Sequence, residues 1–300
     1  MKRKIELYIN HIFIKPLFII IRFLFNPSDK LIKKMRFKGK FKVINNDKKE
    51  FYLYNNAFYL ENSIFWIGID NFYWEKMTRK IWVELSKKSE TIFDVGANTG
   101  IFSVLSKVYN NHAKVVAFEP QPNIYKILKK NKHVNNFNID CEKYGVSNTI
   151  GSANFYNYGE KTFISRNTTA GSLNKNWRKN KQQSISVDIT SLDQYIKDNN
   201  ITQLDLLKID VETHEYEVLL GFEKYFKLYK PIIILEIQNR SIGENIENFI
   251  QSQNYYFYNI NEVSGLSLVN NLGQEIEQNR NYLLCPKHKL NYIEKFIKND

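Results

Sequence analysis

Cysteine, proline and glycine are scarce in this sequence. Its 300 residues contain two cysteines, six prolines and twelve glycines, with neither a C-x-x-C pair nor a local histidine cluster. This pattern indicates neither a disulfide framework nor a structural zinc site, and it favours a reducing, cytoplasmic location. A hydrophobic fraction of 43% beside 25% charged residues predicts a folded chain with one sizeable core.

Long uninterrupted apolar runs are also missing. The most apolar stretch, residues 12–25, contains Lys15, Pro16 and Arg22 and is shorter than the roughly 20 residues that a membrane-spanning helix needs. A polar, lysine-rich segment follows it, where a signal peptide would have small residues at a cleavage site. We therefore expect neither a spanning helix nor a secreted protein.

Acidic residues are much fewer than basic ones only at the N-terminal end. Residues 1–50 hold 14 basic and 4 acidic side chains, whereas the other 250 residues hold 29 and 27. The core is thus nearly neutral, so no basic groove is indicated and no DNA partner is expected. The basic, apolar segment 1–36 fits two alternatives equally: a helix on the anionic inner face of a membrane, or a helix packed on the core or on a second subunit. The oligomeric state stays open.

Strand and helix patterns alternate through most of the chain. Such alternation predicts a parallel sheet with right-handed crossovers. Residues 151–183 are predicted to form a hairpin and a mobile loop. We predict a doubly wound, mostly parallel seven-stranded α/β sheet in residues 87–300, preceded by an N-terminal extension of helices and short strands in residues 1–86. Strand patterns occur in eight segments, one more than the predicted sheet holds: 91–96, 114–119, 137–146, 185–190, 204–210, 231–237, 255–260 and 282–285.

A glycine-containing loop, D-V-G-A-N-T-G, follows the first predicted strand of the sheet. Gly96 and Gly100 permit a tight turn, and the free amide groups of the next helix face the loop. At the end of the following strand, Glu119 could accept both ribose hydroxyls of an adenosine. Together these features predict an adenosine-containing cofactor. Asn98 stands where a dinucleotide site has its second glycine, which disfavours NAD.

Five motifs in this order resemble the FkbM family of methyltransferases: DVGANTG, FEP, LDQYI, LLKIDVE and ILEI. The resemblance covers about residues 91–260. It implies a class I methyltransferase fold, S-adenosylmethionine as cofactor, and O-methylation of a hydroxyl on a sugar, glycan or other secondary metabolite. The cofactor-binding residues that it implies are Asp94, Gly96, Ala97, Asn98, Gly100 and Glu119, with Tyr144 and Gly145 near the adenine.

Two positions depart from the family pattern. Thr213 stands where the family usually has a glycine after its V-E, which costs backbone freedom at the turn and could reshape the acceptor pocket. Gly145 stands where a small residue such as alanine is usual, and this change looks harmless.

Acidic residues gather where the strand at 204–210 meets its helix. Methyl transfer to a hydroxyl requires an acceptor that is positioned, desolvated and deprotonated. Asp210 is the first candidate for the general base or for orienting the acceptor, His214 the second because its pKa lies near neutrality, and Glu212 the third. A lone histidine on a helix is more often structural.

Two further acids are candidates for binding the substrate. Glu215 could do so, or it could be an ordinary first-turn residue favoured by the helix dipole. Glu236 ends the next strand and could bind a sugar hydroxyl or merely pair with Arg240. No metal is predicted, because nothing supplies a full set of oxygen ligands at recognisable spacing.

We predict an S-adenosylmethionine-dependent O-methyltransferase of polysaccharide biosynthesis, which acts on a hydroxyl of a sugar, glycan or glycolipid-linked acceptor. Nucleic-acid methylation is disfavoured because the run D-V-E-T replaces the N-P-P-Y or D-P-P-Y of amino-group methyltransferases. The alternatives are a catalytically inactive cofactor-binding partner in glycan assembly, an RNA methyltransferase and an NAD-dependent oxidoreductase. Residues 159–183 and the lead-in segment are expected to select the acceptor.

Overall fold

The computed structural model describes residues 11–24, 27–158, 169–178, 182–274 and 279–298. Within them, the main sheet has eight strands in the order β13-β12-β14-β11-β10-β3-β4-β5. Its five parallel strands are β3 (Thr91–Val95), β4 (Lys114–Phe118), β5 (Ile139–Glu142), β10 (Leu206–Ile209) and β11 (Ile232–Glu236).

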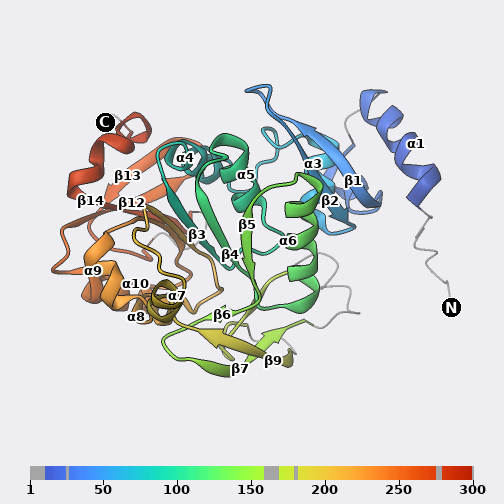
Figure 1. Cartoon of the computed structure of the whole chain (residues 1–300). Helices are drawn as coiled ribbons and strands as arrows, with labels where there is room; N and C mark the ends of the chain where they lie inside the picture. Colours follow the sequence, from blue (N-terminus) through green and yellow to red (C-terminus); the bar gives the residue numbers. More distant parts are fainter. Residues whose placement is uncertain (1–10, 25–26, 159–168, 179–181, 275–278, 299–300) are drawn as a thin grey trace.

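Three antiparallel strands complete one side of this sheet (Figure 1). They are β12 (Tyr255–Asn261), β13 (Gly265–Val269) and β14 (Asn281–Pro286), and the short 3₁₀ turns η1 (Lys287–Tyr292) and η2 (Glu294–Phe296) follow them. The doubly wound, mostly parallel α/β fold is thereby confirmed. The predicted number of seven strands was wrong, because β13 pairs with β12 as a hairpin and adds an edge strand.

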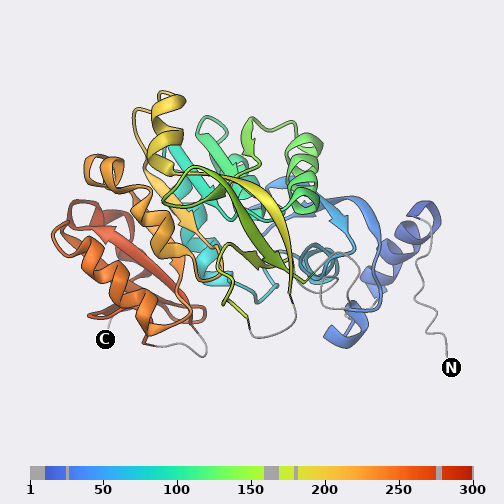
Figure 2. The same cartoon turned by 90° about the horizontal axis from the view of Figure 1, so that it is seen from below.

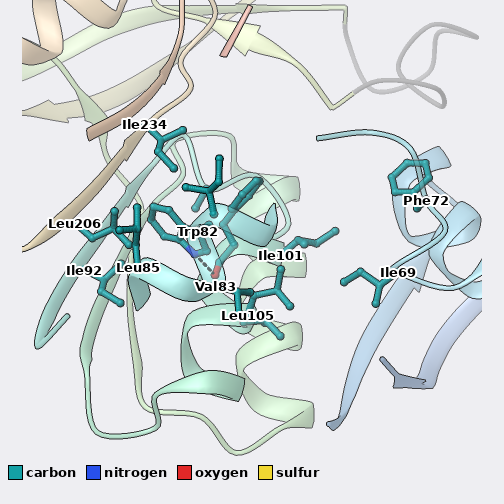
Figure 3. Packing of buried hydrophobic residues seen from close by; sticks show 14 of the residues in the cluster. Ile69, Phe72, Trp82, Val83, Leu85, Ile92, Ile101, Leu105, Leu206 and Ile234 are labelled. Atoms are coloured by element: carbon teal, nitrogen blue, oxygen red, sulfur yellow. Dashed lines mark hydrogen bonds between the residues drawn. The ribbon is translucent and has the colours of Figure 1, made fainter. Parts of the chain in front are cut away.

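Helices cover both faces of the sheet, and alternate residues of the strands point to opposite faces. Ile92 packs in one apolar cluster with Trp82 and Leu105, whereas its neighbour Phe93 packs in another with Val218. Figure 3 shows Trp82 within the first cluster, where its indole nitrogen donates a hydrogen bond to the Phe102 carbonyl at 3.0 Å. Burial on both faces explains why these strands are continuous apolar runs.

The two helical layers have different origins in the chain. The first cluster is covered by α4 (Lys76–Ser86), α5 (Ile101–Tyr109) and α6 (Pro122–Val134). The second is covered by α7 (Leu192–Asp198), α8 (Glu215–Leu220), α9 (Glu223–Tyr229) and α10 (Arg240–Ile250). The chain changes face between β3 and β10, which are adjacent in the sheet. Ligands of such sheets bind beyond the carboxyl ends of the strands at this switch point.

A second, smaller sheet has the order β6-β9-β7-β8. It consists of β6 (Gly145–Val146), β7 (Gly151–Asn157), β8 (Gly171–Ser172) and β9 (Gln183–Thr190), and β7 and β9 lie side by side at its centre (Figure 2). The strand predicted at 185–190 therefore exists, but it belongs to this sheet and not to the main one. The strand predicted at 137–146 is divided into β5 and β6. Most of the predicted mobile loop lies outside the described residues.

The N-terminal part contains α1 (His11–Leu24), α2 (Asp29–Ile32), the antiparallel hairpin β1 (Lys38–Ile44) and β2 (Glu50–Asn56), and α3 (Tyr59–Ile67). The ring of Phe18 in α1 lies 5.1 Å from that of Trp66. Trp66 is buried in the same cluster as Ile92 of β3. The boundary predicted at residue 86 is therefore crossed by a shared core.

The helix α1 and the strands β12–β14 lie at opposite ends of the molecule (Figures 1 and 2). Phe18 and Ile21 of α1 pack against the core, whereas Leu17, Ile20 and Leu24 are 51%, 58% and 77% exposed. This helix is thus apolar on two sides. None of the helices in the described ranges has the length and apolarity needed to cross a membrane.

Candidate active site

A cavity of about 280 Å³ opens at the carboxyl ends of the parallel strands. The loop after β3, the ends of β4, β10 and β11, and the start of β6 form one part of its wall. Residues 58–61 and 72–75 of the N-terminal part form a second part, and Phe155, residues 169–171 and Leu173 form a third. The cavity therefore lies where the switch point predicts a ligand, and the N-terminal part helps to enclose it.

The glycine loop after β3 is held against β10 by close backbone contact. A Cβ atom on Gly96, whose φ is +77°, would lie 1.9 Å from the carbonyl oxygen of Asp210. Asn98 also has a left-handed backbone, with φ +54°, and its amide donates to Glu119 Oε2 at 3.0 Å. Only glycine fits at position 96, because this turn requires both a positive φ and the missing side chain.

Glu119 is fixed by backbone amides on both carboxylate oxygens. Oε2 accepts from Asn98 and Oε1 accepts from the Gln121 amide at 2.8 Å. Burial raises the pKa of Glu119 to about 8. Each oxygen has a further lone pair, so the group can accept hydrogen bonds from the two hydroxyls of a ribose in the cavity that it lines.

Asp94 presents an unused acceptor at the same cavity. Its Oδ2 accepts from the amide and the hydroxyl of Ser103 at 3.1 and 2.6 Å. Its Oδ1 is buried without a hydrogen-bond partner in the described structure. Burial raises the pKa of this carboxyl group. A ligand that donates from an ammonium or hydroxyl group would satisfy Oδ1.

Three of the other predicted cofactor residues also meet at this cavity. Ala97, Tyr144 and Gly145 line it. Gly100 does not contribute to the wall, but a Cβ there would lie 2.4 Å from Leu128, so glycine lets the loop pack on α6. The donors and acceptors present therefore fit an adenosine with a charged amino-acid group.

A buried lysine lies among the acids of the cavity. Lys208 is 3% exposed and donates from Nζ to Asp210 Oδ2 at 2.7 Å. Burial lowers its pKa, but the opposing effects of Asp210, Glu75 and Asp94 are larger together, and the net pKa lies above its ordinary value. Lys208 is therefore a permanent cation that fixes Asp210 in place.

Two further acids stand together on the rim of the cavity. Gln238 donates from Nε2 to Glu212 at 2.6 Å and to Glu236 at 2.9 Å. Burial, with Asp210 and Glu212 nearby, raises the pKa of Glu236 to about 8. Arg240 binds Glu247 and Glu244, so the alternative pairing with Glu236 is not seen. Glu236, Glu212 and Asp210 all line the cavity.

His214 and Glu215 are not brought to the cavity wall. His214 Nε2 lies 3.0 Å from the Ser147 hydroxyl, and burial lowers its pKa. Glu215 is fully buried, and its Oε1 accepts from the amides of Val211 and Thr213 at 3.3 and 3.1 Å. It thus shapes the loop after β10, in keeping with the first-turn alternative.

Thr213 stands where the family usually has a glycine, and its backbone has the left-handed conformation that suits a glycine. Its φ is +71°, and Glu212 beside it has φ +55°. The Asn174 side-chain amide donates to the carbonyl and hydroxyl oxygens of Thr213 at 3.2 and 3.0 Å. These contacts offset part of the conformational cost of a β-branched residue at this turn.

Sequence reasoning missed the residues that the N-terminal part contributes. Tyr73, Trp74 and Glu75 line the cavity, as does Glu61, which is fully buried. Burial raises the pKa of Glu61 to about 7. Glu61 could have been noticed as the one charge in the apolar helix α3, whereas nothing in the local sequence marks Glu75.

The structure shows no metal site in the part that it describes. No group of three or more histidine, cysteine, aspartate or glutamate side chains there could hold a metal ion.

A doubly wound sheet with a glycine loop at its switch point and an acid after the next strand is the arrangement of class I methyltransferases, which use S-adenosylmethionine, and dinucleotide-binding folds share it. A sequence model of the Methyltransferase FkbM domain matches residues 94–257, more than half of the chain. The chain therefore belongs to the FkbM family of methyltransferases.

Several characterised proteins are similar to this chain. Methyltransferase sdnD of Sordaria araneosa is 25% identical over 188 residues, which cover 55% of this chain and 73% of that protein. Hexuronic acid methyltransferase AglP of Haloferax volcanii is 24% identical over 155 residues, covering 52% and 59%. The 31-O-demethyl-FK506 methyltransferase FkbM of Streptomyces tacrolimicus is 27% identical over 162 residues, covering 47% and 62%.

Among solved structures, the methyltransferase FkbM of Methylobacillus flagellatus matches this chain with a TM-score of 0.43 at 15% identity. The match covers 65% of this chain and 43% of that one.

Proposed function

We propose that this protein is an O-methyltransferase that acts on a hydroxyl of a sugar, glycan or glycolipid-linked acceptor. The observation that carries this proposal is the composition of the cavity beside the cofactor loop. Asp210, Glu212 and Glu236 line it together with Tyr73 and Trp74. Carboxylates accept hydrogen bonds from hydroxyl groups, and aromatic faces pack against the C–H face of a sugar ring. The name of the hexuronic acid methyltransferase relative supports the same acceptor class.

The residues near the glycine loop would hold the cofactor. S-adenosylmethionine, when bound, supplies an electrophilic methyl group on a sulfonium sulfur. Glu119 would accept the ribose hydroxyls, and Asp94 Oδ1 would accept from the amino-acid portion. The residues that cover the cavity, such as Tyr59 and Phe72, would exclude water from the reacting groups.

Asp210 would orient the acceptor hydroxyl. Lys208 holds its Oδ2 at 2.7 Å, which leaves Oδ1 to accept a hydrogen bond from the acceptor. Glu212 and Glu236 would bind neighbouring hydroxyls of the same sugar. Because Gln238 holds both of these acids, their positions are set before the acceptor arrives.

Methyl transfer itself tests the proposal. The protein would be incubated with S-adenosylmethionine carrying a labelled methyl group and with nitrophenyl glycosides of hexoses and hexuronic acids. We expect the label to enter at least one glycoside as a methyl ether, identified by mass and by the carbon shift of its O-methyl group. Labelling of nitrogen, or of none of the glycosides while amine or RNA acceptors react, would refute O-methylation of saccharides.

Replacing Tyr73 by alanine would test the aromatic part of the acceptor site. Loss of a stacked ring removes about 1 kcal/mol of contact, so we expect KM for the glycoside to rise about fivefold. The dissociation constant of S-adenosylhomocysteine, measured by calorimetry, should stay unchanged. Leu228→Ala, which removes a comparably exposed side chain on α9, is the control. An equal loss of cofactor affinity in Tyr73→Ala would place this ring at the cofactor instead.

We also propose that the protein is cytoplasmic and lies on the anionic inner face of a membrane through residues 1–36. Leu17, Ile20 and Leu24 form an outward apolar stripe on α1, at the spacing of one helix face. The first 50 residues carry most of the net positive charge of the chain. Such a combination suits binding to an acidic lipid surface, where glycolipid-linked acceptors would be found.

Binding to lipid vesicles tests this placement. We expect the protein to sediment with vesicles containing phosphatidylserine and to bind neutral vesicles weakly. The double variant Leu17→Asp, Ile20→Asp should bind at least tenfold less, because each leucine-sized side chain contributes about 1.5–3 kcal/mol when buried. Leu228→Asp, in helix α9, which lies on the other side of the molecule from α1 (Figure 1), should bind as wild type does. Equal binding by all three proteins would contradict a role for α1.

A further inference from the structure

Glu75 stands at the cavity in an unusual backbone conformation. It follows Trp74 in the loop that enters α4, and its φ and ψ of 47° and 39° are left-handed. A glutamate rarely adopts this conformation unless the surroundings hold it there. The surroundings here include Arg79, which is 5% exposed and donates to the carbonyl oxygens of Ile69, Phe72 and Trp74. The buried side chain of Arg79 therefore fixes the backbone of this loop.

The side chain of Glu75 does not cap α4, the helix that it precedes. An acid at this position would normally cap the free amides of the first turn. That role is filled by Glu262, whose Oε2 accepts from the amides of Met77 and Thr78 at 2.6 and 3.3 Å and whose Oε1 accepts from the Thr78 hydroxyl at 2.5 Å. Glu75 makes no side-chain cap. Its carboxylate is thus available for another purpose.

One oxygen of Glu75 is anchored and the other is free. Oε1 accepts from the Asn281 side-chain amide at 2.9 Å. Oε2 is buried and has no hydrogen-bond partner in the described structure. Because Glu75 lines the cavity, this oxygen is an unsatisfied acceptor at its wall, as are Asp94 Oδ1 beside the cofactor loop and the carboxylate oxygens of Glu61.

The charged groups around Glu75 come from several elements. Lys208 and Asp210 approach from β10 and the loop after it, Glu236 from β11, Glu262 from the β12–β13 turn, and Arg79 from α4. Burial raises the pKa of Glu75 to about 7, and Lys208 limits the rise. At neutral pH, part of the Glu75 population would therefore be ionised and able to accept a proton.

We propose that Glu75, supplied by the segment that precedes the family domain, is the general base that takes the proton of the acceptor hydroxyl. This inference rests on the proposed function. The hydroxyl proton passes to Glu75 Oε2, the electron pair of the acceptor oxygen forms the new C–O bond, and the C–S bond of S-adenosylmethionine breaks with its electrons left on sulfur. Asp210 orients the same hydroxyl and keeps its ion pair with Lys208 throughout.

The variant Glu75→Gln separates this role from cofactor binding. We expect kcat to fall at least a hundredfold, the usual contribution of a general base. The dissociation constant of S-adenosylhomocysteine should remain within twofold of the wild-type value. The rise of kcat/KM with pH, centred near 7 in the wild type, should vanish. A pH profile that keeps its midpoint in the variant, or a matching loss of S-adenosylhomocysteine affinity, would overturn the assignment.

A spectroscopic titration tests Glu75 without any acceptor. With carbon-13 in the glutamate carboxyl groups, the S-adenosylhomocysteine complex should show one resonance that is absent from Glu75→Gln and titrates near pH 7. A midpoint below about 5, as for an ordinary glutamate, would exclude the role. This result stands even if no saccharide is methylated, so it separates the failure of the acceptor class from the failure of the base.

Two variants complete the test. Asn281→Ala removes a hydrogen bond that favours the charged form of Glu75, so the midpoint of kcat/KM should move to higher pH. An unmoved midpoint would contradict the proposal. Glu223→Gln alters an exposed acid on α9 and should leave rate, affinity and pH profile unchanged.

Discussion

Replacing Gly96 by alanine is expected to abolish cofactor binding. The new Cβ would lie 1.9 Å from the carbonyl oxygen and 2.8 Å from the carbonyl carbon of Asp210, both of which are backbone atoms. The left-handed φ of +77° adds a conformational cost of about 1–2 kcal/mol. The glycine loop and the β10 loop would have to separate, which displaces the residues on both sides of the cofactor. We expect at least a hundredfold weaker binding of S-adenosylhomocysteine by calorimetry.

Gly151→Ala is the matched control for this variant. Gly151 also has a positive φ, +131°, but no heavy atom lies within 4 Å of the position of its Cβ. The control therefore carries a backbone cost without the overlap, and it should bind S-adenosylhomocysteine normally. If Gly96→Ala kept an affinity within threefold of wild type, the close contact of the two loops would not be needed for the cofactor.

Lys208→Met should destabilise the protein by about 3–5 kcal/mol, as expected when one partner of a buried ion pair is removed. Asp210 would lose a hydrogen bond of 2.7 Å, and Asp94 and Glu75 would lose a buried cation that lowers their pKa values. Urea denaturation at pH 7 would measure the loss. Lys227→Met, which breaks the exposed pair with Glu223, should cost less than about 1 kcal/mol. Equal losses in the two variants would show that the buried pair adds little.

The effect of Lys208→Met should depend on pH. Lys208 lowers the pKa of Asp94 and of Glu75, so both pKa values rise further when it is removed. A carboxyl group whose pKa is raised by folding stabilises the folded state below its unfolded pKa, and this stabilisation is lost as pH rises through the folded value. The loss in free energy of unfolding caused by Lys208→Met should therefore be larger at pH 8 than at pH 5. A deficit that shrinks with rising pH would contradict this electrostatic account.

The parts of the site that the sequence predicted depend on local pattern. The apolar runs of β3 and β4 place Asp94 and Glu119 at the ends of these strands. Gly96 marks the turn that follows β3. These features follow from the order of residues in one strand–loop–helix unit, so short sequence motifs are sufficient to identify them. The packing of alternate strand residues into two clusters follows from the same periodicity.

The features that sequence reasoning missed depend on long-range contacts. The alternation in residues 185–190 is the same in either sheet, and only its pairing with β7 places that strand in the smaller one. His214 directly precedes α8, and its ring turns to Ser147 and not to the cavity. Glu75 reaches the cavity because Arg79 closes its loop and Asn281 holds its carboxylate. No local pattern contains that information.

The hydrogen bonds that Asn281 and Glu262 make to Glu75 and to the start of α4 can form only late in synthesis of the chain. Glu262 and Asn281 follow Glu75 by nearly two hundred positions or more, and β14, which contains Asn281, is the last strand of the main sheet. A nascent chain that has emerged only as far as β11 already contains the glycine loop, Glu119 and Lys208. At that stage the contacts of Arg79 within the loop are already available, but the Glu75 carboxylate still lacks Asn281 and the start of α4 still lacks Glu262. Competence for catalysis should therefore appear abruptly, when the final strands join the sheet, and not gradually as the ribosome advances.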